Sequence, residues 1–146
     1  MNSLIKSVLI NASLEKVWAL MADTRRTPEW VDGVQESERT GEVSEGKGLC
    51  WRERSLFKNQ NIEMEHEFIE WEPMSRARIK TSLPMNGWMD RTLEFSRTPD
   101  GVEVKVNAKW DLGIAGMLLG ERKVFEILET SFEQTLLNWK ERVEKA

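Results

Sequence analysis

The stretch INASLEKVWALMADTRRTPEW, residues 10–30, contains the end of a strand and the starts of two helices. Ser13 is the predicted N-cap of the first helix, because its hydroxyl can accept a hydrogen bond from a free backbone N–H at a helix start. Apolar residues then recur at helical spacing and predict one buried face, formed by Leu14, Val17, Trp18 and Met21. This helix is predicted to end at residues 23–24.

The segments on either side of the first helix are also short. Residues 4–10 are predicted to form the first strand. Thr27 as N-cap and Pro28 at the first helical position predict a second helix through residues 29–31, which ends near Gly33.

Residues 34–112 consist of short β-branched and aromatic segments separated by turn residues, which predicts six antiparallel strands. Residues 102–112 alternate between apolar and polar side chains, as expected of a strand with one buried face. After the glycines within residues 113–120, one long helix with a single apolar stripe is predicted to run nearly to Ala146. We therefore expect one α+β domain over residues 1–146, with the order β, α, α, six strands and a long helix.

The composition excludes several classes of protein. The chain of 146 residues has a net charge of -4, which argues against a nucleic-acid partner. Its one cysteine, Cys50, and its one histidine, His66, form neither a disulfide nor a zinc cluster, and we expect no metal or cofactor. No apolar segment is long enough to span a membrane, and the N-terminal residues do not have the pattern of a secretory signal, so we expect a cytoplasmic protein.

The order of elements and the opening motif resemble a known superfamily. The motif comprises Ile10 at the end of the strand, EKVW at residues 15–18, Asp23 and PEW at residues 28–30, and the turn at residues 99–101 is similar as well. Together they resemble the START-related, polyketide-cyclase-like SRPBCC superfamily, which includes the birch pollen allergen. The resemblance covers the whole chain. It implies a helix-grip fold, in which a curved seven-stranded antiparallel sheet wraps around the long C-terminal helix.

Relatives in this superfamily include aromatase/cyclases, lipid-transfer proteins, quinone-binding proteins and hormone receptors, so the resemblance implies only a class of ligand. We expect a cavity between the sheet and the long helix to hold a small hydrophobic molecule, such as a lipid, quinone, isoprenoid or polyaromatic compound. The protein is expected to be a monomer or a homodimer. Strand parity and the helix stripe give the candidate ligand contacts, which are Trp51, Ser55, Met64, Phe68, Met89, Phe95, Trp110 and Phe132.

Three ionisable residues have the same inward parity as these contacts, namely Glu53, His66 and Arg91. A two-residue turn at residues 59–60 would pair Glu53 directly with His66, and Arg91 would then pair with Glu53 or bind an anionic ligand group. In a cyclase or dehydratase, His66 would be the general acid/base, Glu53 would orient it and Arg91 would polarise a carbonyl. The alternative is a self-satisfied ion-pair network without a catalytic role, and a one-residue bulge would turn any of the three outward.

Three surface features complete the sequence-based predictions. The glutamates of residues 63–72 are predicted to face arginines on the outer side of the sheet, as a ladder of opposite charges rather than a cation site. Residues 83–88 combine apolar side chains with a glycine and form either a lid or an ordinary hairpin. Ile127 and Leu137 lie off the buried stripe of the last helix, so a protein-interaction module is a third possibility.

Overall fold

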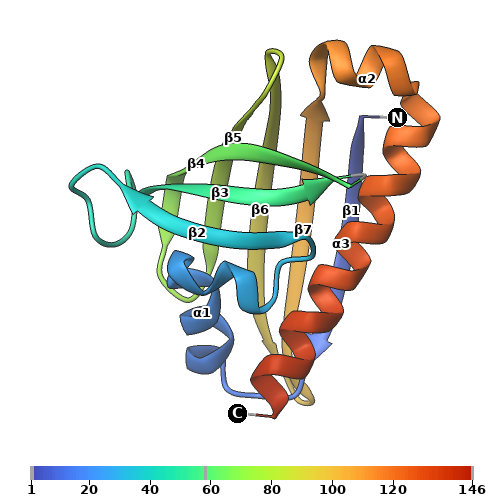
Figure 1. The fold of residues 1–146 in the computed structure, drawn as a ribbon. Coiled ribbons are helices and arrows are strands. Elements are labelled where there is room, and N and C mark those ends of the chain that lie inside the picture. Colours follow the sequence, from blue (N-terminus) through green and yellow to red (C-terminus); the bar gives the residue numbers. More distant parts are fainter. Residues whose placement is uncertain (1, 58, 146) are drawn as a thin grey trace.

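The computed structural model describes residues 2–57 and 59–145. Within them, seven strands form one antiparallel sheet in the order β1-β7-β6-β5-β4-β3-β2. The strands are β1 (Ser3–Ile10), β2 (Val34–Thr40), β3 (Cys50–Phe57), β4 (Gln60–Glu72), β5 (Arg76–Leu83), β6 (Gly87–Thr98) and β7 (Gly101–Asp111). The helices are α1 (Leu14–Ala22), the 3-10 helix η1 (Thr24–Glu29), α2 (Gly113–Leu119) and α3 (Glu121–Glu144). The sheet curves around α3, as Figure 1 shows, and this is the predicted helix-grip fold.

The first helix follows the sequence prediction and the second does not. The Ser13 hydroxyl accepts a hydrogen bond from the Lys16 N–H at 3.3 Å, which confirms the N-cap. The prediction of a helix that starts after Thr27 and continues through residues 29–31 is wrong, because η1 covers Thr24–Glu29. The Asp23 carboxylate caps η1 four residues before the predicted N-cap, Thr27, by accepting from the Arg25 N–H at 3.2 Å.

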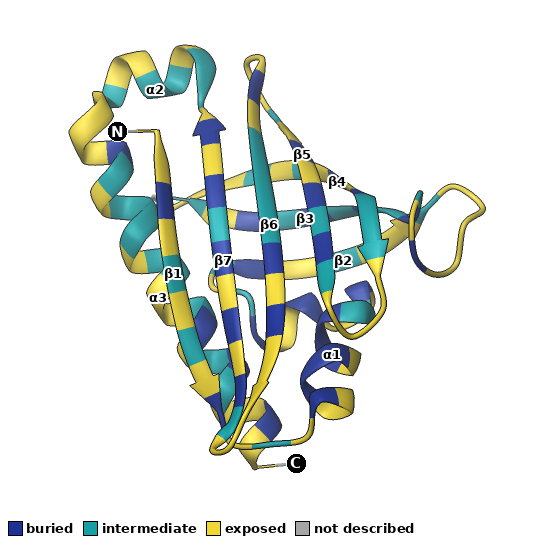
Figure 2. Ribbon diagram, turned by 180° about the vertical axis from the view of Figure 1, so that it is seen from behind, coloured by how far each residue is buried: buried dark blue, intermediate teal, exposed yellow. Residues whose placement is uncertain are grey.

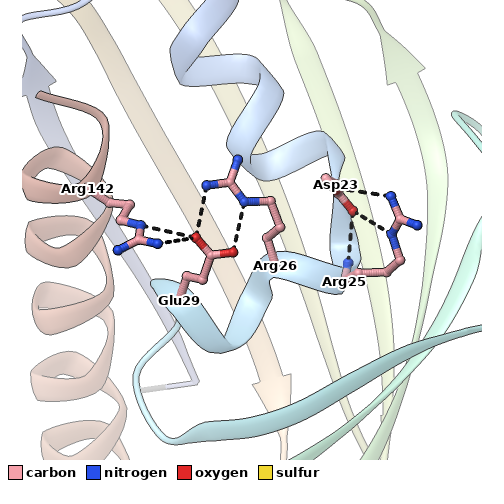
Figure 3. Close-up of polar contacts among 5 residues, drawn as sticks. All are labelled: Asp23, Arg25, Arg26, Glu29 and Arg142. Atoms are coloured by element: carbon pink, nitrogen blue, oxygen red, sulfur yellow. Dashed lines mark hydrogen bonds and ion pairs between the residues drawn. The ribbon is translucent and has the colours of Figure 1, made fainter. Parts of the chain in front are cut away.

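Ion pairs connect η1 to the C-terminal half of α3 (Figure 3). Glu29 accepts two hydrogen bonds from Arg26, both at 2.9 Å, and two from Arg142, from Nη2 at 2.6 Å and from Nε at 3.1 Å. Hydrogen bonds from Arg26 are the main cause of the low pKa of Glu29, which lies at about 2. A carboxylate between two guanidinium groups therefore holds η1 against α3.

Two helices follow β7, where the sequence predicts one long helix after a glycine-containing segment. Gly120, at φ 89°, separates α2 from α3, and its N–H donates to the Gly116 carbonyl at 2.9 Å. The long helix itself is confirmed. Its buried stripe consists of Val124, Leu136, Trp139 and Val143.

The β3–β4 hairpin has a different register from the predicted one. Trp51 pairs with His66 and Glu53 pairs with Met64, so the predicted direct pairing of Glu53 with His66 is wrong. The ladder continues to the pair of Phe57 with Gln60, so Gln60 belongs to β4 and the predicted turn at residues 59–60 is wrong. Because the register differs by two residues, every side chain keeps its predicted face.

The core consists of two clusters of buried apolar residues on the concave face. The larger cluster is formed by buried residues of α1, the central strands and the C-terminal half of α3. The smaller one consists of Leu4, Ala108, Trp110 and Val124. In β4 a bulge between Phe68 and Glu70 changes the parity, so Trp71 packs inward on Trp18 at a ring distance of 4.9 Å. Figure 2 shows the alternation of buried and exposed residues along β7 that this one-sided core produces.

The outer face of the sheet carries the predicted ladder of opposite charges. Arg52 pairs with Glu65 at 3.4 Å, and Arg76 pairs with Glu70 at 3.1 Å. These side chains are partly exposed, so each pair contributes little to stability, about 1 kcal/mol or less.

Candidate functional site

Four polar side chains from four neighbouring strands meet on the concave face, and we call Glu53, His66, Thr81 and Arg91 the polar cluster. His66 Nε2 lies 2.8 Å from Glu53 Oε1, and His66 Nδ1 lies 2.6 Å from Thr81 Oγ1. Arg91 Nη2 lies 3.2 Å from both His66 Nδ1 and Thr81 Oγ1. The Trp51 indole N–H donates to Glu53 Oε2 at 2.8 Å. The three ionisable residues predicted from parity therefore come together.

The hydrogen bonds assign one tautomer to His66. A guanidinium group only donates, so the nitrogen that faces Arg91, Nδ1, must be an acceptor. The Nε2–H of His66 then donates to the Glu53 carboxylate, while the Thr81 hydroxyl donates to Nδ1 and accepts from Arg91. The result is a continuous chain of donors from the Arg91 cation through Thr81 and a neutral imidazole to the Glu53 anion.

Burial and charge set the ionisation of the cluster. Burial raises the pKa of the Glu53 carboxyl, but the His66 ring, the Arg91 charge and the Trp51 N–H outweigh it and bring the pKa to about 2. Burial is also the main cause of the lowered pKa of His66, and the Arg91 charge lowers it further against the opposing effect of Glu53. Burial lowers the pKa of Arg91, opposed by Glu53 and Asp90. At neutral pH the cluster thus holds one carboxylate, one guanidinium and a neutral imidazole.

The lowered pKa of His66 predicts a loss of stability under mildly acidic conditions. The unfolded chain binds a proton at His66 below the ordinary pKa of 6.5, whereas the folded protein does so only at lower pH. The free energy of unfolding should therefore decrease as the pH falls below 6.5. Glu53 contributes a separate loss between its ordinary pKa of 4.5 and its folded value of about 2. Urea unfolding between pH 7.5 and 5, at constant ionic strength, measures the first of these losses.

The matched variant for this prediction is His66→Gln, which keeps polar atoms in the site but has no proton to bind. Its free energy of unfolding should vary less with pH than that of the wild type between pH 6.5 and 5. Equal slopes for the two proteins would show that His66 is not the group responsible.

An indole lies on each side of the polar cluster. Successive cross-strand partners on β3 to β7 form one row across the concave face, consisting of Trp51, His66, Thr81, Met89 and Trp110. Trp51 stacks on His66 with ring centroids 5.0 Å apart, and Trp110 packs against Phe125 of α3 at 6.2 Å. The cluster thus lies between apolar walls that strengthen its electrostatic interactions.

Several buried polar atoms on the concave face have no hydrogen-bond partner among the described residues. These atoms include Ser55 Oγ, Arg91 Nε and Trp110 Nε1. Arg91 and Trp110 lie on neighbouring strands, where Arg91 pairs with Ala108 two residues from Trp110. Each of these three groups can donate a hydrogen bond, so each would be stabilised by an acceptor oxygen.

The other predicted ligand contacts fall into two groups. Phe68 and Phe95 belong to the larger core cluster, where Phe95 packs against Trp18 at a ring distance of 4.9 Å. Met64, Met89 and Phe132 are half-buried. Among the predicted ligand contacts, the partly exposed side chains therefore lie on β4, β6 and α3, whereas Phe68 and Phe95 are buried in the core near α1.

Two hollows of the described surface lie outside this region. One, of about 620 Å³, lies between the β1–α1 turn and the β6–β7 hairpin, and its lining includes Ser13 and Arg97. The other, of about 480 Å³, lies between η1 and α3, and its lining includes Arg26 and Arg142. Neither is lined by a predicted ligand contact, so the internal cavity stays a prediction. No group of three or more metal-ligating side chains is present in the described part of the chain.

Two details of the polar cluster differ from the sequence-based account. Thr81 is a site residue that the sequence-based prediction does not include, although it shares the parity of the buried residues Ala77 and Ile79 on the concave face. In the described residues Arg91 makes no direct ion pair with Glu53, and the two charges are instead connected through Thr81 and His66. A threonine hydroxyl completes the network because it can accept and donate at the same time.

A family model described as "Polyketide cyclase / dehydrase and lipid transport" matches residues 1–144. The chain belongs to this family. Its structural neighbours belong to the SRPBCC superfamily, as the sequence motif indicated. No curated protein matches the chain.

Solved structures share the fold at low sequence identity. The Zhui aromatase/cyclase from Streptomyces sp. R1128 is 11% identical with a TM-score of 0.83, over 98% of this chain and 93% of that one. StfQ, a di-domain ARO/CYC from the steffimycin biosynthetic pathway, is 10% identical with a TM-score of 0.81, over 99% of this chain and 51% of that one. Ara h 8.0201 is 12% identical with a TM-score of 0.75, over 99% and 98%. The family description supports a role in hydrophobic-ligand binding or cyclisation, and the solved structures support the fold.

Proposed function

We propose that this protein binds a small hydrophobic molecule that carries oxygen acceptors, between the concave face of the sheet and α3. The observation that supports this proposal is the set of buried polar groups without partners among the described residues, Ser55 Oγ, Arg91 Nε and Trp110 Nε1. A buried donor left without an acceptor costs about 1–3 kcal/mol, so a ligand that supplies acceptors is stabilised at these positions. Quinones and oxygenated polyaromatic compounds have this combination of an apolar body and peripheral oxygens.

The polar cluster favours binding over catalysis. A general acid/base needs a nitrogen or oxygen within hydrogen-bond reach of the substrate. Both nitrogens of His66 already have protein partners, Glu53 at 2.8 Å and Thr81 at 2.6 Å. The cluster therefore serves to hold the Arg91 guanidinium in a fixed orientation, so that its remaining N–H groups can anchor an oxygen of the ligand.

Native mass spectrometry of the purified protein, followed by organic extraction, tests the proposal directly. The expected result is a stoichiometric apolar compound that contains oxygen. If the protein purifies empty, titration with 1-anilinonaphthalene-8-sulfonate is expected to give saturable fluorescence at one site. A protein that purifies without a ligand and also shows no saturable binding of 1-anilinonaphthalene-8-sulfonate would contradict the proposal.

A Trp110→Phe variant tests the polar part of the site. It removes the unpartnered indole N–H and keeps an aromatic ring against Phe125. Loss of one neutral hydrogen bond should weaken binding of the extracted compound about three- to tenfold. Trp88→Phe is the matched control, because Trp88 is an exposed tryptophan outside the concave face. Equal affinities for the two variants would exclude Trp110 as a ligand donor.

A cyclase or dehydratase is the second candidate function. The 2.8 Å hydrogen bond between Glu53 and His66 favours it, because a carboxylate that orients an imidazole is the arrangement of a general acid/base. In this case the hydrogen bond between His66 Nδ1 and the Thr81 hydroxyl would be replaced by one to the substrate, and Arg91 would polarise a substrate carbonyl. His66→Gln would then abolish turnover of a polyketide-like substrate and retain its binding, whereas a carrier would show no turnover in either protein.

A further inference from the structure

The short helix α2 exposes apolar side chains to solvent. None of its seven described residues is buried, and Ile114, Met117 and Leu118 are exposed by 56%, 84% and 81%. No charged residue occurs from Leu112 to Gly120. A helix with this composition normally packs against another element, so its exposure indicates a contact surface.

The β5–β6 hairpin extends this surface. Its residues Met85 and Trp88 are exposed by 57% and 42%. The hairpin lies beside the start of α2, because a Cβ atom on Gly113 would be 2.3 Å from the Met85 carbonyl oxygen, and Trp88 pairs with Asp111. Figures 1 and 2 both place α2 and this hairpin at the same end of the molecule, opposite α1. We call Met85, Trp88, Ile114, Met117 and Leu118 the α2–hairpin patch.

The size of the patch argues against a stable protein interface. At these exposed fractions the five side chains present about 600 Å² of surface, whereas each partner of a standard interface contributes about 800 Å². The patch is also formed by two projecting segments, the tip of a hairpin and one short helix. Side chains that project in this way are suited to insertion into a soft apolar layer.

The residue types and the neighbouring charges fit a lipid surface. Trp88 has the amphipathic ring that is enriched at membrane–water interfaces. Arg122 and Lys123 lie in the first turn of α3, close to the end of α2, and both are exposed. Arg122 pairs with Glu126 at 3.5 Å, but this pair is exposed, so a lipid phosphate could replace the carboxylate if Met117 and Leu118 were inserted. No helix in the described part of the chain is long and apolar enough to cross a membrane, which leaves attachment at the interface.

We propose that the α2–hairpin patch docks on the surface of a lipid bilayer that contains anionic lipids. Met85, Trp88, Ile114, Met117 and Leu118 enter the headgroup region, and Arg122 and Lys123 contact lipid phosphates. This docking goes beyond the proposed ligand binding and does not depend on the identity of the ligand.

The experiment is flotation of the full chain with vesicles of equimolar phosphatidylcholine and phosphatidylglycerol. The wild type is expected to float with the vesicles, and a Met117→Asp/Leu118→Asp double variant is expected to lose about tenfold or more of the bound fraction. The matched control is Ile5→Asp/Leu137→Asp, in which two apolar residues exposed by 58% and 45% outside the patch are changed in the same way. This control should float like the wild type.

A second variant pair tests the charge contribution. Arg122→Glu/Lys123→Glu should reduce binding to the phosphatidylglycerol vesicles and have little effect with phosphatidylcholine alone, and added salt should reduce the difference. Circular dichroism and thermal unfolding of each variant establish that it is folded.

Three outcomes would overturn the proposal. The first is a wild type that does not bind either kind of vesicle, and the second is a Met117→Asp/Leu118→Asp variant that binds as well as the wild type. The third is a concentration-dependent dimer of the wild type that this variant abolishes, which would assign the patch to self-association.

Discussion

A Glu53→Leu variant is expected to lose about 3–5 kcal/mol of the free energy of unfolding, because it leaves the half-buried Arg91 guanidinium without the carboxylate that balances its charge. It also removes the acceptor of two buried hydrogen bonds, from His66 at 2.8 Å and from Trp51 at 2.8 Å. The Glu53 side chain is only 5% exposed, so water does not replace these interactions. Urea unfolding followed by tryptophan fluorescence measures the loss.

Two further variants make this result specific to the polar cluster. Glu63→Leu on the outer face of β4 also removes a carboxylate from the sheet, but Glu63 is exposed, so a change within about 0.5 kcal/mol is expected. The Glu53→Leu/Arg91→Met double variant removes both charges together. Its loss in the free energy of unfolding should therefore be smaller, by at least about 1 kcal/mol, than the losses of Glu53→Leu and Arg91→Met added together. Additive losses would show that the two charges do not interact through His66 and Thr81.

A Trp139→Ala variant is expected to destabilise the protein by about 3–5 kcal/mol, as large-to-small substitutions of buried aromatic residues do. The Trp139 side chain is fully buried and packs on Trp30 at a ring distance of 4.7 Å and on Phe95 at 5.8 Å. Its indole N–H donates to the Val17 carbonyl at 3.2 Å and so connects α3 to α1. Thermal and urea unfolding are the measurements.

Trp88→Ala is the matched control for Trp139→Ala. It removes the same side chain from an exposed position, so the free energy of unfolding should change by no more than about 0.5 kcal/mol. The same variant should weaken vesicle binding if the α2–hairpin patch docks on lipid. A large loss of stability in Trp88→Ala would mean that the hairpin tip contributes to the folded core.

Strand faces could be predicted from sequence where no bulge interrupts the strand, because there they depend on parity alone. Glu53, His66 and Arg91 share the concave face with apolar neighbours, and the structure places all three there. The predicted register of the β3–β4 hairpin is wrong by two residues. Parity does not detect this difference, because a shift of two residues moves no side chain to the other face of the sheet. The cluster forms all the same, since Glu53 reaches His66 diagonally across the strand pair.

Local hydrogen bonds account for most of the other differences between sequence and structure. The start of η1 depends on the Asp23 side chain, which competes with Thr27 as a cap. Helix α2 is short, contains two glycines and buries none of its described residues, so no buried stripe marks it in the sequence. Thr81 becomes part of the site only through its contacts with His66 and Arg91, which no sequence motif specifies.

The position of the single histidine has a practical consequence for spectroscopy. The chain contains one imidazole, and this imidazole lies at the centre of the polar cluster. A nitrogen-15 NMR spectrum of histidine-labelled protein therefore contains side-chain signals from this site alone and needs no assignment by mutation. The two nitrogens of a neutral ring resonate far apart, so the spectrum reports directly which nitrogen carries the proton. Any small molecule that changes the hydrogen bonds of His66 would shift these two signals, which makes the native protein its own sensor in a screen for the ligand.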